Sequence, residues 1–165
     1  MLMYAIGSIG NTYQSLLPVN PDFELIQLFG FIIDGKSLHN SWVPFQMKFG
    51  SKAKHMKVGD IFSTYYTTGS LPIFSNKSVQ FLSNLLEPYG ELLPVYAYGE
   101  VYYIYNCTTL KSLNEIKEEN FGDIFKLTSA PFYNKVIVSQ NFLDIIKKNK
   151  LKGFNFETFD TSIVY

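Results

Sequence analysis

The sequence predicts a single α+β domain, residues 1–165, in which a mixed, mostly antiparallel sheet carries a few packed helices. Three observations support this fold class. The length of 165 residues and the hydrophobic content of 47% are sufficient for one buried core. Short apolar runs predict strands, and two of them are followed by apolar side chains at helical spacing. A Tyr-rich segment of alternating polarity predicts a β-hairpin.

The first half of the chain gives the weaker structural signals. Residues 3–9 and residues 60–66 each resemble a strand. Residues 23–33 are apolar almost throughout, so their pattern is compatible with a helix and, over residues 31–33, with the end of a strand. Residues 37–59 show no clear period, and we expect a long loop with short strands there.

The second half contains an apparent repeat of one supersecondary unit. Residues 71–75 form a short apolar strand pattern that ends at Ser75, and residues 135–139 form another that ends at Ser139. Each serine is followed by apolar residues at helical spacing. A Ser hydroxyl can accept a hydrogen bond from the first turn of a helix, which is worth roughly 1 kcal/mol. The pattern predicts two similar strand–Ser–helix units whose helices pack on a shared sheet.

Residues 93–107 alternate on both sides of Gly99-Glu100, which predicts a hairpin with its two-residue turn at that dipeptide. This register pairs Tyr96 with Tyr103 and Tyr98 with Val101. Because strand side chains alternate between faces, one face would carry the core residues Val95, Ala97, Tyr102 and Ile104. The other face would carry Tyr96, Tyr98, Val101, Tyr103 and Tyr105.

The charge and composition of the chain argue against one class of partner, nucleic acids. All 14 basic residues are lysines, and 14 acidic residues balance them. Arg is the usual residue for bidentate contacts to phosphates and base edges, so its absence at zero net charge argues against a nucleic-acid partner. We interpret the densest basic run as a solvated loop, with contact to a phosphate backbone as the alternative. The run comprises Lys48, Lys52, Lys54, His55 and Lys57.

The single cysteine, Cys107, allows no intrachain disulfide and favours a reducing compartment. Residues 1–10 contain no basic residue and do not resemble a signal peptide. No window approaches the roughly 18 uninterrupted apolar residues of a membrane-spanning helix. We therefore expect a cytoplasmic protein without a membrane span.

No catalytic, cofactor-binding or metal-binding set stands out in the sequence. His39 and His55 are 16 positions apart, and neither adjoins a cysteine or a cluster of carboxylates. Cys107 follows a predicted strand and is interpreted as a buried structural thiol. We expect a protein that is not an enzyme and needs no cofactor or metal. A small enzyme that uses Cys107 or a pair of carboxylates is the alternative.

Several short segments occur in an order that resembles immunity protein family eleven of bacterial polymorphic toxin systems. The similarity covers about residues 42–157 and rests on Trp42-Val43-Pro44, Gly59-Asp60, Pro72–Ser75, Leu93–Val95, Tyr102–Asn106, Phe125–Leu127, Ile137–Ser139 and Leu151–Phe156. The resemblance implies a cytosolic protein that binds and neutralises a cognate secreted toxin, encoded beside it, and so protects the producing cell and its kin. It provides no catalytic residues. A general protein-interaction adaptor is a further alternative.

Two groups of residues are candidates for contact with a protein partner. Tyrosines on the open face of a hairpin are stiff and amphipathic, so they can bury a large area at low entropic cost. The acidic run could face a basic partner or form a solvated loop. The candidates are Tyr96, Tyr98, Tyr103, Tyr105, Glu115, Glu118 and Glu119. A helix that covers the tyrosine face would instead make these rings part of the core.

Overall fold

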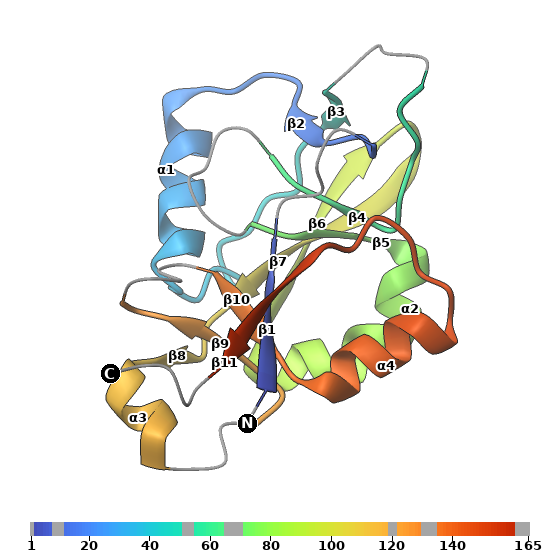
Figure 1. Cartoon of the computed structure of the whole chain (residues 1–165). Coiled ribbons are helices and arrows are strands. Elements are labelled where there is room, and N and C mark those ends of the chain that lie inside the picture. The colour runs from blue at the N-terminus through green and yellow to red at the C-terminus, as the bar shows by residue number, and fades with distance from the viewer. Residues whose placement is uncertain are drawn as a thin grey trace.

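The computed structural model describes residues 2–7, 12–50, 55–64, 71–118, 122–129 and 135–160, with the backbone alone at residues 117 and 118. Within these residues, helices and mostly antiparallel sheets form an α+β fold, as the sequence predicts (Figure 1). The strands belong to two main sheets and one small ribbon.

The first main sheet has four strands in the order β4-β5-β7-β6, and all neighbouring strands are antiparallel. These strands are β4 (Ile61–Phe62), β5 (Ile73–Ser75), β6 (Gly90–Ala97) and β7 (Glu100–Cys107). The long hairpin of β6 and β7 provides most of this sheet. A separate ribbon pairs β2 (Leu16–Pro18) with β3 (Met47–Phe49).

The second main sheet has five strands in the order β11-β1-β10-β9-β8. Strands β8 and β9 are parallel, and the other neighbours are antiparallel. The strands are β1 (Leu2–Ile6), β8 (Leu110–Lys111), β9 (Ile124–Leu127), β10 (Val136–Val138) and β11 (Phe156–Asp160). Strand β1 is the first element of the chain, yet it lies between two strands from the last third of the sequence.

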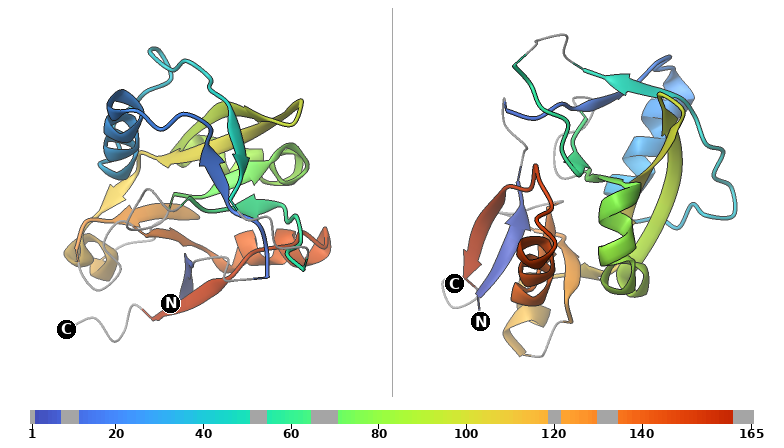
Figure 2. Two further views of the ribbon diagram at one scale, coloured as in Figure 1. Left: turned by 90° about the horizontal axis from the view of Figure 1, so that it is seen from above. Right: turned by 90° about the vertical axis from the view of Figure 1, so that its right-hand side faces the viewer.

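Helices α2 (Asn76–Leu86) and α4 (Gln140–Lys148) share one core with both main sheets. A short 3-10 helix, η1 (Glu87–Tyr89), continues α2. The two helices contact each other and lie side by side in both figures (Figures 1 and 2). The core residues include Phe74, Leu82, Leu86, Tyr105, Ile124, Val138, Phe142 and Ile146.

Each main sheet also buries its second face. Helix α1 (Phe23–Ile33) and the β2–β3 ribbon pack on the second face of the four-stranded sheet, where Phe29, Met47 and Ile104 share a core. Helix α3 (Leu113–Glu118) places Ile116 against the second face of the five-stranded sheet. The sheets are therefore separate layers, which corrects the prediction of one shared sheet.

The two predicted strand–Ser–helix units are present, because Ser75 is the N-cap of α2 and Ser139 is the N-cap of α4. In the first unit β5 and β6 are parallel, with β7 inserted between them in the antiparallel direction. In the second unit β10 and β11 are parallel, with β1 inserted in the same way. Both units therefore have the topology of a split β–α–β motif, and β1 takes the place of β7.

An identical tetrapeptide begins both units. Gly-Asp-Ile-Phe occurs at residues 59–62, before β5, and again at residues 122–125, before β10. The main-chain oxygen of Asp60 accepts a hydrogen bond from the Ser75 N–H, and that of Asp123 accepts one from the Ser139 N–H, both at 2.9 Å. This repeated contact extends the similarity of the two units beyond the serines from which it was predicted.

Residues 23–33 form one uninterrupted helix, so the strand interpretation of residues 31–33 is wrong. Asp22 caps the start of α1 by accepting a hydrogen bond from the Leu25 N–H at 2.8 Å. At the other end, the buried Lys126 ammonium donates to the main-chain oxygens of Ile32 at 2.8 Å and of Ile33 at 3.3 Å. A distant lysine thus satisfies carbonyls at the negative end of the helix.

Strand β1 covers residues 3–6 of the strand predicted at 3–9 and begins one residue earlier, and β4 covers residues 61–62 of that predicted at 60–66. Residues 8–9 and 65–66 lie outside the described residues. Within residues 37–50, β3 is the short strand expected in a long loop.

Candidate partner-binding surface

The β6–β7 hairpin turns at Tyr98-Gly99, one residue earlier than predicted. Ala97 pairs with Glu100, and Tyr96 pairs with Val101 instead of Tyr103. Tyr98 has φ +52° and Gly99 has φ +79°, which fits a tight two-residue turn with positive φ at both positions. Each pairing is shifted by two residues, so the division of side chains between the two faces is unchanged.

The face predicted to be core is buried as expected. Its side chains face α1 and the β2–β3 ribbon, and they are Val95, Ala97, Tyr102 and Ile104. This part of the hairpin is therefore a scaffold for the exposed residues at its tip.

The opposite face is only partly open, because α2 covers one end of it. Tyr105 is 1% exposed, and its hydroxyl donates to the main-chain oxygen of Leu86 at 2.9 Å. Burial raises the pKa of Tyr105 far above its ordinary value. Tyr105 is thus a core residue, which corrects its assignment as a contact residue. Tyr103 is half-buried.

Tyr96 and Tyr98 remain exposed, at 39% and 65% respectively. The Tyr98 ring lies 4.8 Å from the Phe49 ring, between centroids, and its hydroxyl accepts a hydrogen bond from the Phe49 N–H at 3.0 Å. One edge of the ring is therefore anchored on β3 while most of its surface stays open.

Two neighbouring segments carry further exposed apolar residues, Val43 and Val19. The Trp42 Nε1 donates to the main-chain oxygen of Pro94 at 2.8 Å, and the Tyr96 N–H donates to that of Phe45 at 3.0 Å. These contacts hold Val43, which is 74% exposed, next to β6. Val19 is also exposed, and its N–H donates to the main-chain oxygen of Gln46 at 3.0 Å. We refer to Val19, Val43, Tyr96 and Tyr98 as the tip surface.

Glu115, the predicted acidic residue whose side chain the structure describes, does not adjoin the hairpin tip. Glu115 is exposed on α3, where its carboxylate accepts the Ser112 N–H at 2.5 Å. The Ser112 hydroxyl accepts the Glu115 N–H at 3.4 Å, which completes a capping box. The hydrogen bond from the Ser112 main chain holds the pKa of Glu115 below its ordinary value. Glu118 ends α3, its side chain is not described, and Glu119 lies outside the described residues.

Helix α3 and the hairpin tip lie at opposite ends of the molecule in both views (Figures 1 and 2). The structure therefore places Glu115 far from the exposed tyrosine at the hairpin tip, Tyr98. Tyr98 and Glu115 are close in the sequence. They lie far apart in the fold because the chain passes from the four-stranded sheet to the five-stranded sheet after β7.

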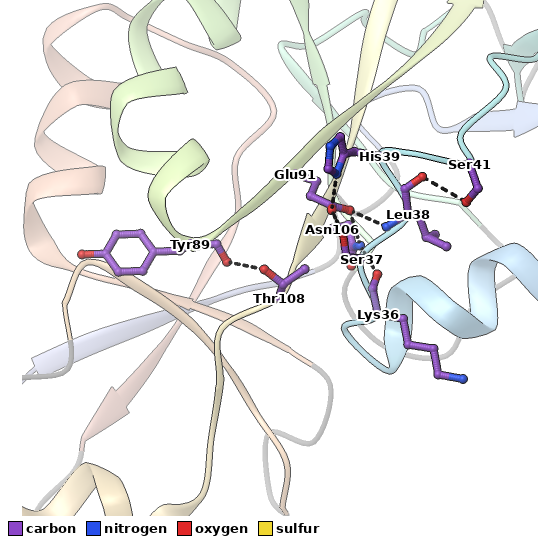
Figure 3. Close-up of polar contacts among 9 residues, drawn as sticks. All are labelled: Lys36, Ser37, Leu38, His39, Ser41, Tyr89, Glu91, Asn106 and Thr108. Carbon is purple, nitrogen blue, oxygen red and sulfur yellow. Dashed lines mark hydrogen bonds and ion pairs between the residues drawn. The ribbon is translucent and has the colours of Figure 1, made fainter.

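A polar cluster around Glu91 fixes the loop after α1 onto the hairpin (Figure 3). The Glu91 carboxylate accepts hydrogen bonds from the Ser37 hydroxyl, and at 2.9 Å from both the Leu38 N–H and the Asn106 Nδ2. The His39 Nδ1 lies 3.5 Å from the same carboxylate. Sequence inspection missed the contact between His39 and Glu91, because the two residues come from different elements.

The chemistry of this cluster is that of a structural clamp. Burial raises the pKa of Glu91, but the hydrogen bonds from Ser37, Leu38 and Asn106 outweigh it and leave the pKa below its ordinary value. A carboxylate that is already engaged by several donors is a weak proton acceptor. Glu91 therefore stabilises the loop instead of activating Ser37.

Cys107 is fully buried, and its sulfur lies 3.7 Å from the main-chain oxygen of Tyr89 and 3.6 Å from that of Thr109. Burial raises the pKa of the thiol, although the nearby Lys126 charge opposes this shift. A protonated thiol is a poor nucleophile. His55 is exposed, and no group of three or more His, Cys, Asp or Glu side chains in the described residues could hold a metal ion.

Within the described parts of the chain, no helix combines the length and the apolar character needed to cross a membrane. Comparison of the sequence with protein-family models and with curated proteins finds no match.

Proposed function

We propose that this chain is an immunity protein: it binds a cognate toxin domain in the cytoplasm and neutralises it. The tip surface is the contact region in this proposal. The resemblance of residues 42–157 to immunity protein family eleven supports the class of partner, and the exposed apolar residues support recognition by protein contact.

The conformation of Tyr98 is the observation that carries this proposal. Both positions of such a turn favour Asn, Asp or Gly, because positive φ crowds an ordinary side chain and costs about 1–2 kcal/mol. The chain nevertheless has a large ring at φ +52° and leaves it 65% exposed. Strained residues that are kept exposed gather at functional sites.

The tip surface also has the chemistry of a binding hot spot. Tyr side chains are enriched at the centres of interfaces, where they bury much area with few rotatable bonds. The Phe49 contacts hold the Tyr98 ring in place before binding, so less conformational entropy is lost on association. Val43 and Val19 are two further exposed apolar side chains, on segments that hydrogen-bond to β6 and to Gln46 respectively.

The enzyme alternative, which uses Cys107 or a pair of carboxylates, draws no support from Cys107 or from the carboxylate cluster around Glu91. Cys107 is buried with a raised pKa, and Glu91 is engaged by three donors with a lowered pKa. In this proposal the protein acts by occupying a surface of the toxin.

The test compares tip variants with a variant elsewhere, using the toxin domain encoded beside this chain. Val43→Asp and Tyr96→Ala are expected to weaken binding at least about tenfold, or about 1.4 kcal/mol, with little change in thermal stability. Leu110→Ala is the control, since Leu110 on β8 is 40% exposed and Tyr96 is 39% exposed. Wild-type affinity in folded tip variants, or an equal loss in the control, would remove the tip surface from the interface.

A further inference from the structure

Five exposed lysines gather where α4 ends and α2 begins. Lys147 and Lys148 close α4, Lys150 and Lys152 follow directly, and Lys77 lies in the first turn of α2. We refer to these five residues as the lysine surface.

Asp60 joins the two parts of this surface. Its N–H donates to the main-chain oxygen of Lys152 at 2.8 Å, and its carboxylate accepts the Lys152 N–H at 2.7 Å. The same carboxylate lies 3.9 Å from the Lys77 Nζ. The other four lysines form no ion pair with any residue that the structure describes. Their charges are therefore available to a partner.

Lys150 occupies a position that favours glycine. The Leu151 N–H donates to the main-chain oxygen of Ile146 at 3.1 Å, and the Lys150 N–H donates to that of Lys147 at 3.2 Å. These two bonds close α4 in a Schellman motif, in which the residue with positive φ is usually Gly. Lys150 has φ +52°. The chain thus has a lysine at a position where glycine would be less strained. This lysine also lies among other lysines whose positive charges repel its own.

The lysine surface and the β6–β7 hairpin tip, where Tyr98 forms the turn, lie on the same side of the molecule. In Figure 1 the end of α4, the start of α2 and the β6–β7 tip are all on the right, and the right panel of Figure 2 turns this side toward the reader. Among the described residues, Tyr98 and Lys150 are the non-glycine residues with positive φ. Each belongs to one of these two surfaces.

We propose that the lysine surface receives an acidic face of the same protein partner and orients it toward the tip surface. This inference rests on the proposed function. Charged groups at the rim of an interface act mainly on the association rate and its salt dependence, while apolar contacts at the centre act on dissociation. An exposed aromatic hairpin tip and a separate positive surface on the same side of the molecule follow this division.

A protein partner fits these lysines better than a nucleic acid does. The chain has no Arg and no net charge, whereas nucleic-acid-binding domains are usually basic and use Arg for bidentate contacts. The tip surface, which the same partner contacts in this proposal, also offers valines and tyrosines that suit a protein surface.

The test measures association kinetics with the toxin domain at low and at physiological salt. The double variant Lys148→Gln/Lys150→Gly removes two charges and relieves the positive φ, so it is expected to be at least as stable as wild type. Its association rate constant at low salt is expected to fall at least about threefold, with the difference shrinking as salt screens the charges. The dissociation rate constant is expected to change little.

The matched control is Lys36→Gln/Lys111→Gln, which removes the same number of charges near the C-terminal end of α1 and on β8. Its association rate is expected to stay near the wild-type value. Equal rates for the two double variants would overturn the inference while leaving the proposed function standing. Absence of any complex with wild type would instead overturn the proposed function. Lysine-dependent binding of a single-stranded DNA oligonucleotide, without an effect on toxin association, would assign the surface to nucleic acid and overturn the inference.

Discussion

Glu91 and Lys126 show how single polar side chains join distant parts of this fold. Glu91 holds the loop after α1 through hydrogen bonds from Ser37 and Leu38. The buried Lys126 carries its ammonium from β9 to the end of α1. Burial lowers the pKa of Lys126, and the neighbouring Cys107 and Asp34 oppose that shift. Both residues attach α1 and its loop to sheets that lie far away in the sequence.

The Glu91 cluster predicts a pH dependence of stability on the acid side. The folded-state pKa of Glu91 lies below the ordinary value of 4.5, so its contribution is fully present above that value and is lost as the pH falls through the folded-state pKa. In urea unfolding, wild type is expected to be more stable than Glu91→Gln at neutral pH. This difference is expected to shrink below pH 4.5.

His39 contacts the same carboxylate, so the comparison is made in a His39→Gln background. A stability difference that stays constant between neutral and acid pH would show that the Glu91 charge does not stabilise the fold.

The two helix-capping serines make different contacts, and this difference can be measured. The Ser75 hydroxyl accepts the Ser78 N–H at 3.1 Å and lies 3.5 Å from the Asp60 carboxylate. The Ser139 hydroxyl caps no N–H and donates to the Asp123 carboxylate at 2.5 Å. Ser75→Ala is expected to cost about 1 kcal/mol as a lost cap.

Double-mutant cycles separate the two cases. The cycle of Ser139→Ala with Asp123→Asn is expected to give a coupling of about 1 kcal/mol or more, because a short bond to a carboxylate is lost. The cycle of Ser75→Ala with Asp60→Asn is expected to give a smaller coupling. Equal couplings from thermal unfolding would mean that both serines serve their helices in the same way.

The elements that the sequence predicted best are those with strong local patterns. The helices after Ser75 and Ser139 are confirmed, because their apolar spacing and the preceding serine agree. The predicted division of hairpin side chains between two faces is confirmed. The turn lies one residue earlier than predicted, because Tyr98 adopts a positive φ, which is more usual for Asn or Gly. The hydroxyl cap expected of Ser139 is absent, because Asp123 lies closer to that hydroxyl.

Long-range contacts account for what the sequence did not predict. Tyr105 and Tyr96 lie on the same face of the hairpin, but only Tyr105 is covered by α2. The periodicity of one strand shows which residues share a face, but it does not show which element packs on that face. The separation into two sheets depends on β1 pairing with β10 and β11 across most of the chain. The repeated Gly-Asp-Ile-Phe could have predicted the antiparallel strand pair at the start of each unit, β4 with β5 and β9 with β10.

At the scale of the whole molecule, the two split β–α–β units differ mainly in how their middle strand is connected. Strand β7 follows β6 directly, whereas β1 reaches its place between β10 and β11 from the start of the chain. Leu2 pairs with Asp160 in antiparallel β1 and β11, so the described ends of the chain adjoin each other.

This arrangement predicts that a circular permutant will fold. The permutant joins Asp160 to Leu2 through a short turn and opens the chain after Gly7, which makes β9, β10, α4, β11 and β1 contiguous. It is expected to keep the amide-exchange protection of β1, β10 and β11, because the strand pairings are preserved. The control is the linear chain of residues 2–160. An unfolded permutant beside a folded linear control would contradict the equivalence of β1 and β7.

The central claim is that this protein binds a toxin domain through its tip surface, and titration calorimetry tests it most directly. The measurement uses the toxin domain that the proposal expects to be encoded beside this chain. It compares wild type with Tyr98→Asn, in which Asn tolerates the positive φ but lacks the ring. We predict a saturable complex with wild type. We also predict at least about tenfold weaker binding by the variant, without a marked fall in its thermal midpoint. No binding by folded wild type, or equal affinity for the two proteins, would contradict the account.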